Sequence, residues 1–458
     1  MHGMTPGCAR HRPDRLPRPA RLVLALCLAG VSPVFAQDVS ADTVADLRAE
    51  IQTLRAEQAE RDLRIRRLEQ ALERLAGEPA TAVPAAGLAE ASLPALEPAH
   101  TASAAQPALA AVPVDSAAAP RLKVSGDLRL RGQGDWSDDD AGSRGSMQLR
   151  GRLGATFAVS DRITLGARLA TGDGDDPNST DVQLSNWLDD LEVSLDMAYA
   201  RFDLGELSLY GGKMPQPFVR TDLVWDGDVN PQGLAAIWRR PLAGGGNLRA
   251  AGLGFIVDES AGGSDSTMLG AQLGYESAQR GDWKFDAHAA YFHYSLGSIA
   301  GADSGDFRSN LRDASGNYLS DFHLANLLLG ATWSGLGERW PLKLTADYVH
   351  NTGAATDADT GYGVDLSLGR ANAPGDWRVT WGHAVAETDA VLSAFSQDNI
   401  GIATNYRLHS LTVDYVPIPK TMLSLYWYRY RPDSALYPAG HAPDDWLDRL
   451  RLALLFSF

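Results

Sequence analysis

The chain has few cysteines, few lysines and few long apolar runs. Both of its cysteines, Cys8 and Cys27, lie within the first 36 residues, so the rest of the chain has to be stable without disulfides. After those residues, no apolar run approaches the ~18 residues that a spanning helix needs. These absences exclude a helical membrane protein. They leave open a membrane protein built from alternating strands, which hydropathy averages do not detect.

The first 36 residues have the pattern of a secretory signal peptide. Five arginines precede an apolar segment at 22–31, and Val34-Phe35-Ala36 forms a small-residue exit, so we expect cleavage before Gln37. A short N-terminal anchor is the alternative. Cleavage would change the net charge from −16 to about −20. An exported chain this acidic is a poor candidate for binding nucleic acid.

Two segments of different composition follow. In residues 37–76, apolar residues recur at spacings of three and four, interrupted at Gln58 and Arg61, which predicts a short parallel periplasmic coiled coil. A lone amphipathic helix is the alternative. Residues 77–120 are rich in alanine and proline and poor in aromatics, a composition that predicts an extended, flexible linker.

From residue 121 onward, apolar and polar residues alternate as they do in half-buried strands. The end of the chain shows this well, with an apolar residue at every second position from Leu450 to Phe458 and arginines at 449 and 451. A strand at the edge of a soluble sandwich is the alternative for this segment alone. Sixteen segments are predicted to be strands: 121–133, 146–159, 162–171, 191–204, 206–214, 232–240, 247–258, 267–277, 282–296, 321–335, 340–351, 360–370, 376–387, 404–416, 420–431 and 445–458.

The connections between these segments alternate between short and long. Outer-membrane barrels have short periplasmic turns and longer external loops on an even number of strands, whereas a soluble sandwich has no reason to sort its loops by length. The sequence therefore predicts an all-β fold, a transmembrane antiparallel β-barrel of about 16 strands over residues 121–458. With a periplasmic N-terminus, sixteen strands return Phe458 to the periplasm.

Arginines gather on one predicted wall of this barrel. A barrel of sixteen strands encloses a water-filled channel, and strand parity points seven arginines of the first three strands and the last strand inward at similar heights. We expect them to form a pore-lining basic arc. The alternative is that they are solvated wall residues paired with Asp127 and with loop carboxylates. The arc comprises Arg129, Arg131, Arg150, Arg152, Arg168, Arg449 and Arg451.

The segment 215–230 is expected to fold into the lumen and narrow it. Prolines at 215, 217 and 231 stiffen it, and its aromatic residues favour packing on protein over solvent. Acids on this loop, facing the arginine arc, would set a transverse field, and rings of charge select ions in this way. An ordinary external loop is the alternative. The predicted constriction residues are Phe218, Arg220, Asp222, Trp225, Asp226 and Asp228.

Other chemistry is weakly indicated. The acidic stretch 173–178 departs from a calcium-binding EF-hand, since Leu184 stands where the bidentate Glu belongs. His288 and His293 have opposite parity and cannot share a metal from one face. Hydrolase motifs of the Gly-x-Ser-x-Gly or His-Glu-x-x-His type are absent from the sequence. We expect no enzyme activity, no cofactor and no metal.

The sequence GGKMPQPF at 211–218, followed by TDLVWDGD at 221–228 and NPQGL at 230–234, resembles the signature of a bacterial putative porin family. RLATG at 168–172 is also similar, as is the order of signal peptide, coiled coil, linker and barrel. The resemblance implies an outer-membrane diffusion channel and identifies no ligand residue. Phosphate-selective porins also carry an N-terminal helical segment, and the arginine arc would suit them, but this chain lacks their lysine-rich character.

These observations predict a porin in the outer membrane of a Gram-negative bacterium, through which small hydrophilic solutes and ions diffuse passively. The expected partners are outer-membrane lipid and lipopolysaccharide, two further copies in a homotrimer, the barrel assembly machinery through the C-terminal strand, and the cell wall through the coiled coil. The alternatives are a barrel-anchored structural or adhesive envelope protein and an anion (phosphate)-selective channel.

Overall fold

The computed structural model describes residues 121–137, 143–172, 177–184, 191–260, 264–297, 309–313, 315–435 and 444–458. The expected signal peptide, coiled coil and linker lie outside the described residues, as does the acidic stretch 173–176. In the described part of the chain, no helix is long and apolar enough to cross a membrane.

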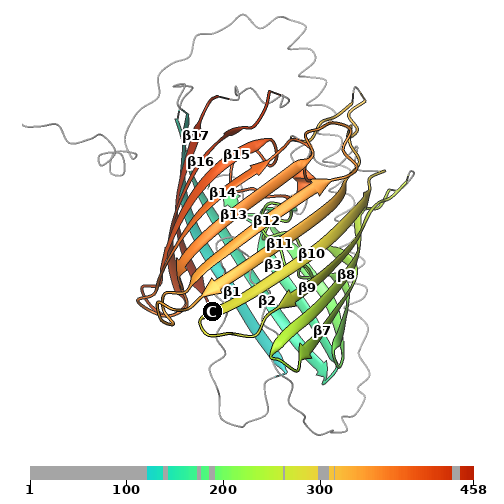
Figure 1. Cartoon of the computed structure of the whole chain (residues 1–458), viewed down its shortest axis with the longest axis vertical. Helices are drawn as coiled ribbons and strands as arrows, with labels where there is room; N and C mark the ends of the chain where they lie inside the picture. The colour runs from blue at the N-terminus through green and yellow to red at the C-terminus, as the bar shows by residue number, and fades with distance from the viewer. Residues whose placement is uncertain are drawn as a thin grey trace, which may run out of the picture. The chain divides into compact units, whose positions relative to one another are not determined.

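Sixteen long antiparallel strands and one two-residue strand form a single closed sheet (Figure 1). β1 (Leu122–Ser137) pairs with both β2 (Ser143–Ser160) and β17 (Leu447–Ser457), and this closes the barrel. Closure leaves no unpaired sheet edge, as a membrane requires. The predicted barrel of sixteen strands is confirmed, with strand ends shifted by a few residues. The other strands are β3 (Ile163–Thr171), β4 (Val182–Gln183), β5 (Val193–Leu204), β6 (Leu207–Lys213), β7 (Gln232–Leu242), β8 (Gly246–Asp258), β9 (Ser266–Glu276), β10 (Trp283–Ser295), β11 (His323–Trp333), β12 (Leu342–Asn351), β13 (Thr360–Gly369), β14 (Trp377–Ala386), β15 (Tyr406–Tyr415) and β16 (Thr421–Pro432).

The alternation of side chains separates an apolar outer face from the inner wall. On β17, Leu450 and Leu452 are exposed, whereas Arg451 and Ala453 are buried. At the end with the short turns, outward aromatics contact one another, as in the stacked pair of Trp377 and Tyr415, 4.3 Å between ring centroids. An apolar outer band edged by aromatics is typical of barrels that face lipid.

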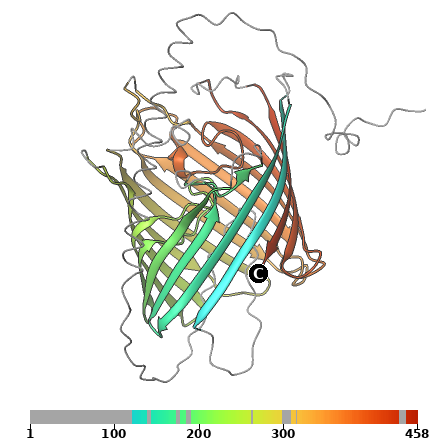
Figure 2. The ribbon, with the colours of Figure 1, turned by 180° about the vertical axis from the view of Figure 1, so that it is seen from behind.

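Apolar side chains also fill part of the barrel interior. The buried cluster combines inward residues of the wall, such as Phe255 and Phe292, with residues of two long connections, such as Trp225 and Phe395. These connections run from β6 to β7 and from β14 to β15. Figure 2 shows the barrel from behind, where the wall formed by β1 to β7 is coloured from cyan to green. Since wall side chains alone cannot fill a barrel of this size, the two connections supply the apolar volume.

Phe458 lies against β1 where the barrel closes. The Gly126 backbone N–H donates to the Phe458 carbonyl oxygen at 3.3 Å, and the Phe458 N–H donates back at 3.0 Å. A Cβ added to Gly126 would lie 2.4 Å from the Phe458 ring and 2.5 Å from the Arg152 carbonyl oxygen. The seam therefore requires glycine at this position.

Gly126→Ala is expected to destabilise the barrel, because its Cβ would push the Phe458 ring and the β2 backbone away. Overpacking of this kind costs about 1–3 kcal/mol. The readouts are the thermal midpoint in detergent and the difference in gel mobility between unheated and heated protein. Gly244→Ala is the matched control, because nothing lies within 4 Å of its added Cβ. Equal midpoints for the two variants would show that the seam does not depend on this close approach.

Candidate functional site

The connection between β6 and β7, residues 214–231, crosses the barrel interior. The Gln272 side chain on β9 accepts from Val219 N at 2.9 Å and donates to Val219 O at 2.7 Å. Thr221 Oγ1 donates to Asp347 on β12. At the other end, the Asp228 carboxylate lies 3.0 Å from a guanidinium nitrogen of Arg152 on β2. Because β2 and β12 lie on opposite sides of the ring, these contacts place the segment inside the barrel.

A second inward segment, residues 387–405 between β14 and β15, was not predicted. Its stretch 388–397 is entirely buried and contains the short helix η3 (Ser393–Phe395). Phe395 contacts Phe255 on β8 with a centroid separation of 5.3 Å. This segment was expected to be an external loop. Its apolar residues were the signal against that, since a solvated loop has no reason to carry Val391, Leu392, Phe395, Ile400 and Ile402.

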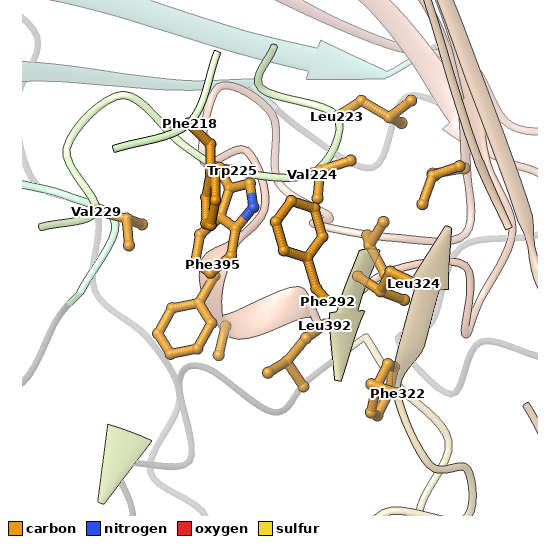
Figure 3. Packing of buried hydrophobic residues seen from close by; sticks show 14 of the residues in the cluster. Phe218, Leu223, Val224, Trp225, Val229, Phe292, Phe322, Leu324, Leu392 and Phe395 are labelled. Atoms are coloured by element: carbon orange, nitrogen blue, oxygen red, sulfur yellow. The ribbon is translucent and has the colours of Figure 1, made fainter. Parts of the chain in front are cut away.

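The two inward segments meet at Trp225 and Phe395. Their rings stack with centroids 5.6 Å apart and an interplanar angle of 18° (Figure 3). The Asp226 backbone N–H donates to the Phe395 carbonyl oxygen at 2.8 Å. Asn399 Nδ2 donates to Asp222 Oδ2 at 2.9 Å. Trp225 is only 1 % exposed, so the contact is buried within the barrel.

Asn310, in the connection between β10 and β11, hydrogen-bonds the backbone of the second inward segment. Its Nδ2 donates to the carbonyl oxygens of Thr388 and Val391, each at 2.9 Å. Its Oδ1 accepts from Ser393 N at 2.8 Å. One buried amide thus satisfies the backbone of an irregular segment that has no sheet partner, as buried polar groups require.

The central arginines lie on the inner wall, each within reach of a carboxylate. Arg150 and Arg152 share Asp127, at 3.1 and 2.7 Å, and both approach Asp228. Their side chains are only 4 % exposed. This is the pairing with Asp127 and a loop acid that the alternative interpretation of the arc described. These two arginines hold the first inward segment to the wall and are largely covered by it.

Four of the other five arginines of the arc also bind a carboxylate, and Arg451 binds side-chain amides. Arg129 and Arg131 both bind Asp181, which follows β3, at 2.5 Å. Arg168 pairs with Asp196 on β5. On β17, Arg449 binds Asp135 at 2.6 Å. Arg451 Nε donates to Gln133 Oε1 at 2.7 Å, and both β17 arginines donate to Asn399 of the second inward segment.

The inner wall on the far side carries acids that were not singled out from the sequence. Asp347 on β12 accepts from Asn326 Nδ2 at 2.5 Å as well as from Thr221. Asp365 lies next to it on β13, and a Cβ added to Gly382 would meet its carboxylate at 2.5 Å. Among the described residues, neither acid forms an ion pair. Inward parity on the segments 340–351 and 360–370 was the signal that could have found them.

The six predicted constriction residues take different places. Phe218 and Trp225 are buried in the interior cluster. Arg220 donates to the Trp225 carbonyl oxygen at 2.7 Å and so braces its own loop. Asp222 meets the second segment, Asp228 meets the arginines, and Asp226 accepts from Asp228 N at 2.8 Å.

Asp226 and Asp228 have opposite electrostatic environments two residues apart. Burial raises the pKa of Asp226 well above its usual range, and the carboxylates of Asp398 and Asp222 raise it further. Burial also raises the pKa of Asp228, but the guanidinium groups of Arg150 and Arg152 outweigh it, so this pKa is lowered. The surroundings of Asp228 therefore favour its charged form, whereas those of Asp226 favour its neutral form.

Residues 139–319 match the model of a family described as "Putative porin". The match covers 181 of the 458 residues and lies within the barrel. The predicted resemblance is thereby confirmed, and the family together with the closed barrel makes the chain a porin channel of the Gram-negative outer membrane.

Solved structures similar to this porin are themselves bacterial porins of low sequence identity. OprB of Pseudomonas putida, in its high-pH structure, has a TM-score of 0.49 at 13 % identity, covering 74 % of this chain and 94 % of its own. OmpF of Salmonella typhi, in complex with daunomycin, has a TM-score of 0.46 at 12 % identity, with coverages of 74 % and 97 %. An anion-selective porin from Comamonas acidovorans has a TM-score of 0.44 at 13 % identity, with coverages of 74 % and 99 %. No curated protein matches this porin in sequence.

The opposite environments of the two acids predict opposite effects of neutralisation. Asp228→Asn removes a charge that Arg150 and Arg152 hold, and breaking a buried pair in this way costs about 3 kcal/mol or more. Asp226→Asn removes a charge that its site disfavours, so the thermal midpoint at pH 7.5 should equal or exceed that of the wild type.

The pH dependence checks the sign. When folding raises the pKa of a carboxyl group, the protonated group stabilises the folded state. This stability is lost as the pH rises from the pKa of the group in the unfolded chain to its pKa in the folded protein. The advantage of Asp226→Asn should therefore shrink as the pH is lowered toward 4. Thermal melts of both variants from pH 4 to pH 8 measure this. A midpoint for Asp226→Asn that falls as far as that of Asp228→Asn would contradict the assignment.

Proposed function

We propose that this porin lets small hydrophilic solutes and ions diffuse through a lumen narrowed by two inward segments, residues 214–231 and 387–405. The observation that carries the proposal is the buried stack of Trp225 on Phe395, which joins both segments within the ring of strands. What remains open to solutes is the part of the lumen that the interior cluster does not fill. Passive diffusion through such a channel needs no catalytic group, and we assign the chain no enzyme activity.

We assign the channel a preference for cations. Six of the seven arginines of the arc have acidic partners on the wall or the loops, which offset most of their charge. On the far wall, Asp347 and Asp365 form no ion pair among the described residues. Uncompensated acids along a pore attract cations. The alternative of an anion-selective or phosphate-selective channel has less support, because it needs the arginines free.

The proposal extends to assembly as a homotrimer. Outward positions on β2, β3, β5 and β6 hold mainly aliphatic and small residues, with Phe157 and Phe202 as exposed aromatics, whereas exposed tyrosines and tryptophans lie on β10, β12, β13, β14 and β16. A wall without the tyrosines and tryptophans of a lipid-facing edge suits contact with another copy. The predicted coiled coil would join the copies and reach the cell wall in the periplasm. The C-terminal strand would be read by the barrel assembly machinery.

Opening the aromatic stack should raise the single-channel conductance in planar bilayers. Trp225→Ala with Phe395→Ala removes the contact between the two segments, at a stability cost of about 3–5 kcal/mol for each buried ring. The matched control is Trp283→Ala with Phe285→Ala, which removes a stacked pair on the outer face, 5.7 Å between centroids. Gel mobility before and after heating verifies that both variants are folded. Equal conductance in the two variants would end the constriction claim, and absence of any current in the wild type would favour the structural or adhesive alternative.

Removing one acid from the far wall should weaken the preference for cations. Asp365→Asn is expected to shift the reversal potential in a salt gradient toward that of an anion-preferring channel. Asp444→Asn removes a carboxylate that is 99 % exposed, and serves as the control. A reversal potential that Asp365→Asn leaves unchanged would show that selectivity arises elsewhere.

A further inference from the structure

Three arginines face outward on the last strands, at the end that carries the long connections. Arg407 lies on β15, and Arg429 and Arg431 lie on β16. Their neighbours in sequence, such as Tyr406, Tyr428 and Tyr430, point inward into the buried cluster. The three arginine side chains are 45 %, 35 % and 26 % exposed, respectively.

The strand register places basic side chains opposite one another here. Arg407 stands directly opposite Arg431, and His409 directly opposite Arg429. His383 extends the row on β14, with its ring 4.6 Å from that of His409. Like charges directly opposite each other destabilise a sheet, and nearby carboxylates offset part of this repulsion.

Carboxylates position these arginines. Asp433 lies 2.5 Å from Arg407, Asp448 lies 2.8 Å from Arg429, and Asp444 lies 3.2 Å from Arg431. Asp448 is itself buried and accepts from Trp427 Nε1 at 2.8 Å. The guanidinium groups are thus fixed in place while much of their surface stays exposed on the outer side.

Trp446 adds an aromatic face to the arginines. The guanidinium carbons of Arg429 and Arg431 lie 5.4 and 5.2 Å from the centre of its ring. The His409 ring lies 6.1 Å from it. Arginines pair with phosphate oxygens in a fixed geometry, and an aromatic face can contact the apolar face of a sugar ring.

The level of this cluster on the barrel identifies its surroundings. Along β16, the exposed apolar residues Leu423, Leu425 and Trp427 occupy the preceding outward positions. The cluster begins where this apolar band ends, at the long-loop end of β14 to β17 (Figure 1). In an outer-membrane barrel this is the headgroup level of the outer leaflet.

The geometry points to a binding site for the phosphate groups of an outer-leaflet glycolipid on the outward surface formed by Arg407, Arg429, Arg431 and Trp446. The phosphates bind the guanidinium groups, the sugar lies on the Trp446 ring, and the acyl chains follow the apolar surface of β15 to β17. The inference rests on the outer-membrane location. It is independent of how the lumen selects ions.

Native mass spectrometry of the purified full chain in detergent tests the site. Two probes are compared, lipid A with two phosphates and lipid A with one phosphate. The test variant combines Arg407→Gln, Arg429→Gln and Arg431→Gln. The control combines Arg162→Gln, Arg240→Gln and Arg280→Gln, which are exposed arginines at the short-turn end. The bisphosphorylated lipid should bind the wild type and the control alike, and should bind the test variant at least about tenfold more weakly, since each lost guanidinium is a lost charged hydrogen bond. The monophosphorylated lipid should show a smaller difference.

Equal binding of the bisphosphorylated lipid by the test variant and the control would overturn the inference. So would a test variant that binds lipid normally but changes the mass of the assembly, because the surface would then join copies of the chain. If the triple variant does not fold, Arg407→Gln alone is compared with Arg240→Gln, with the same two outcomes. Conductance recorded on the same samples keeps this result separate from the porin proposal, because the surface lies outside the lumen.

Discussion

The stacking of Trp225 on Phe395 inside the barrel is the contact on which the rest of the interior depends. A ring of sixteen strands is too wide to be filled from its own wall. Two connections that start from different sides of the ring enter it, and neither has a sheet partner for its backbone. They stabilise each other through this stack, through the hydrogen bond from Asp226 to Phe395 and through the amide of Asn399. The lumen is therefore shaped by packing of the kind found in the core of a soluble protein.

Electrostatics hold this packed unit to the wall. Arg150 and Arg152 are almost completely buried, and buried charges are tolerated only when they are paired. Asp127 from the wall and Asp228 from the loop meet this requirement together, so the loop acid does more to fix the segment than to project a field into the pore. On the far wall Thr221 hydrogen-bonds Asp347 without neutralising it, and Asp365 remains beside it. The asymmetry between compensated arginines and uncompensated acids gives the channel its proposed preference.

The strands, the closing seam and the inward orientation of the arginines could be predicted because they follow from a period of two residues. The first inward segment was also predictable, because prolines and buried-type aromatics such as Phe218 and Trp225 are unusual in a solvated loop. The second segment carries the same kind of signal in Val391, Leu392 and Phe395, yet it was taken for an external loop because connection length was the criterion. Asp127 was named from the sequence as a partner of the arginines, whereas Asp181 and Asp196 were not, because their pairing depends on how the folded segments lie against β1 and β3. The N-terminal predictions fall on residues that the structure does not describe.

The central claim is that the two joined segments set the width of the channel. The most direct test is the size of the largest polyethylene glycol that enters the open channel in planar bilayers. The wild type is compared with a variant in which residues 390–401 are replaced by a short glycine–serine linker. If the segments form the constriction, the variant admits larger polymers than the wild type and conducts more. An unchanged size limit in a folded variant would contradict the account.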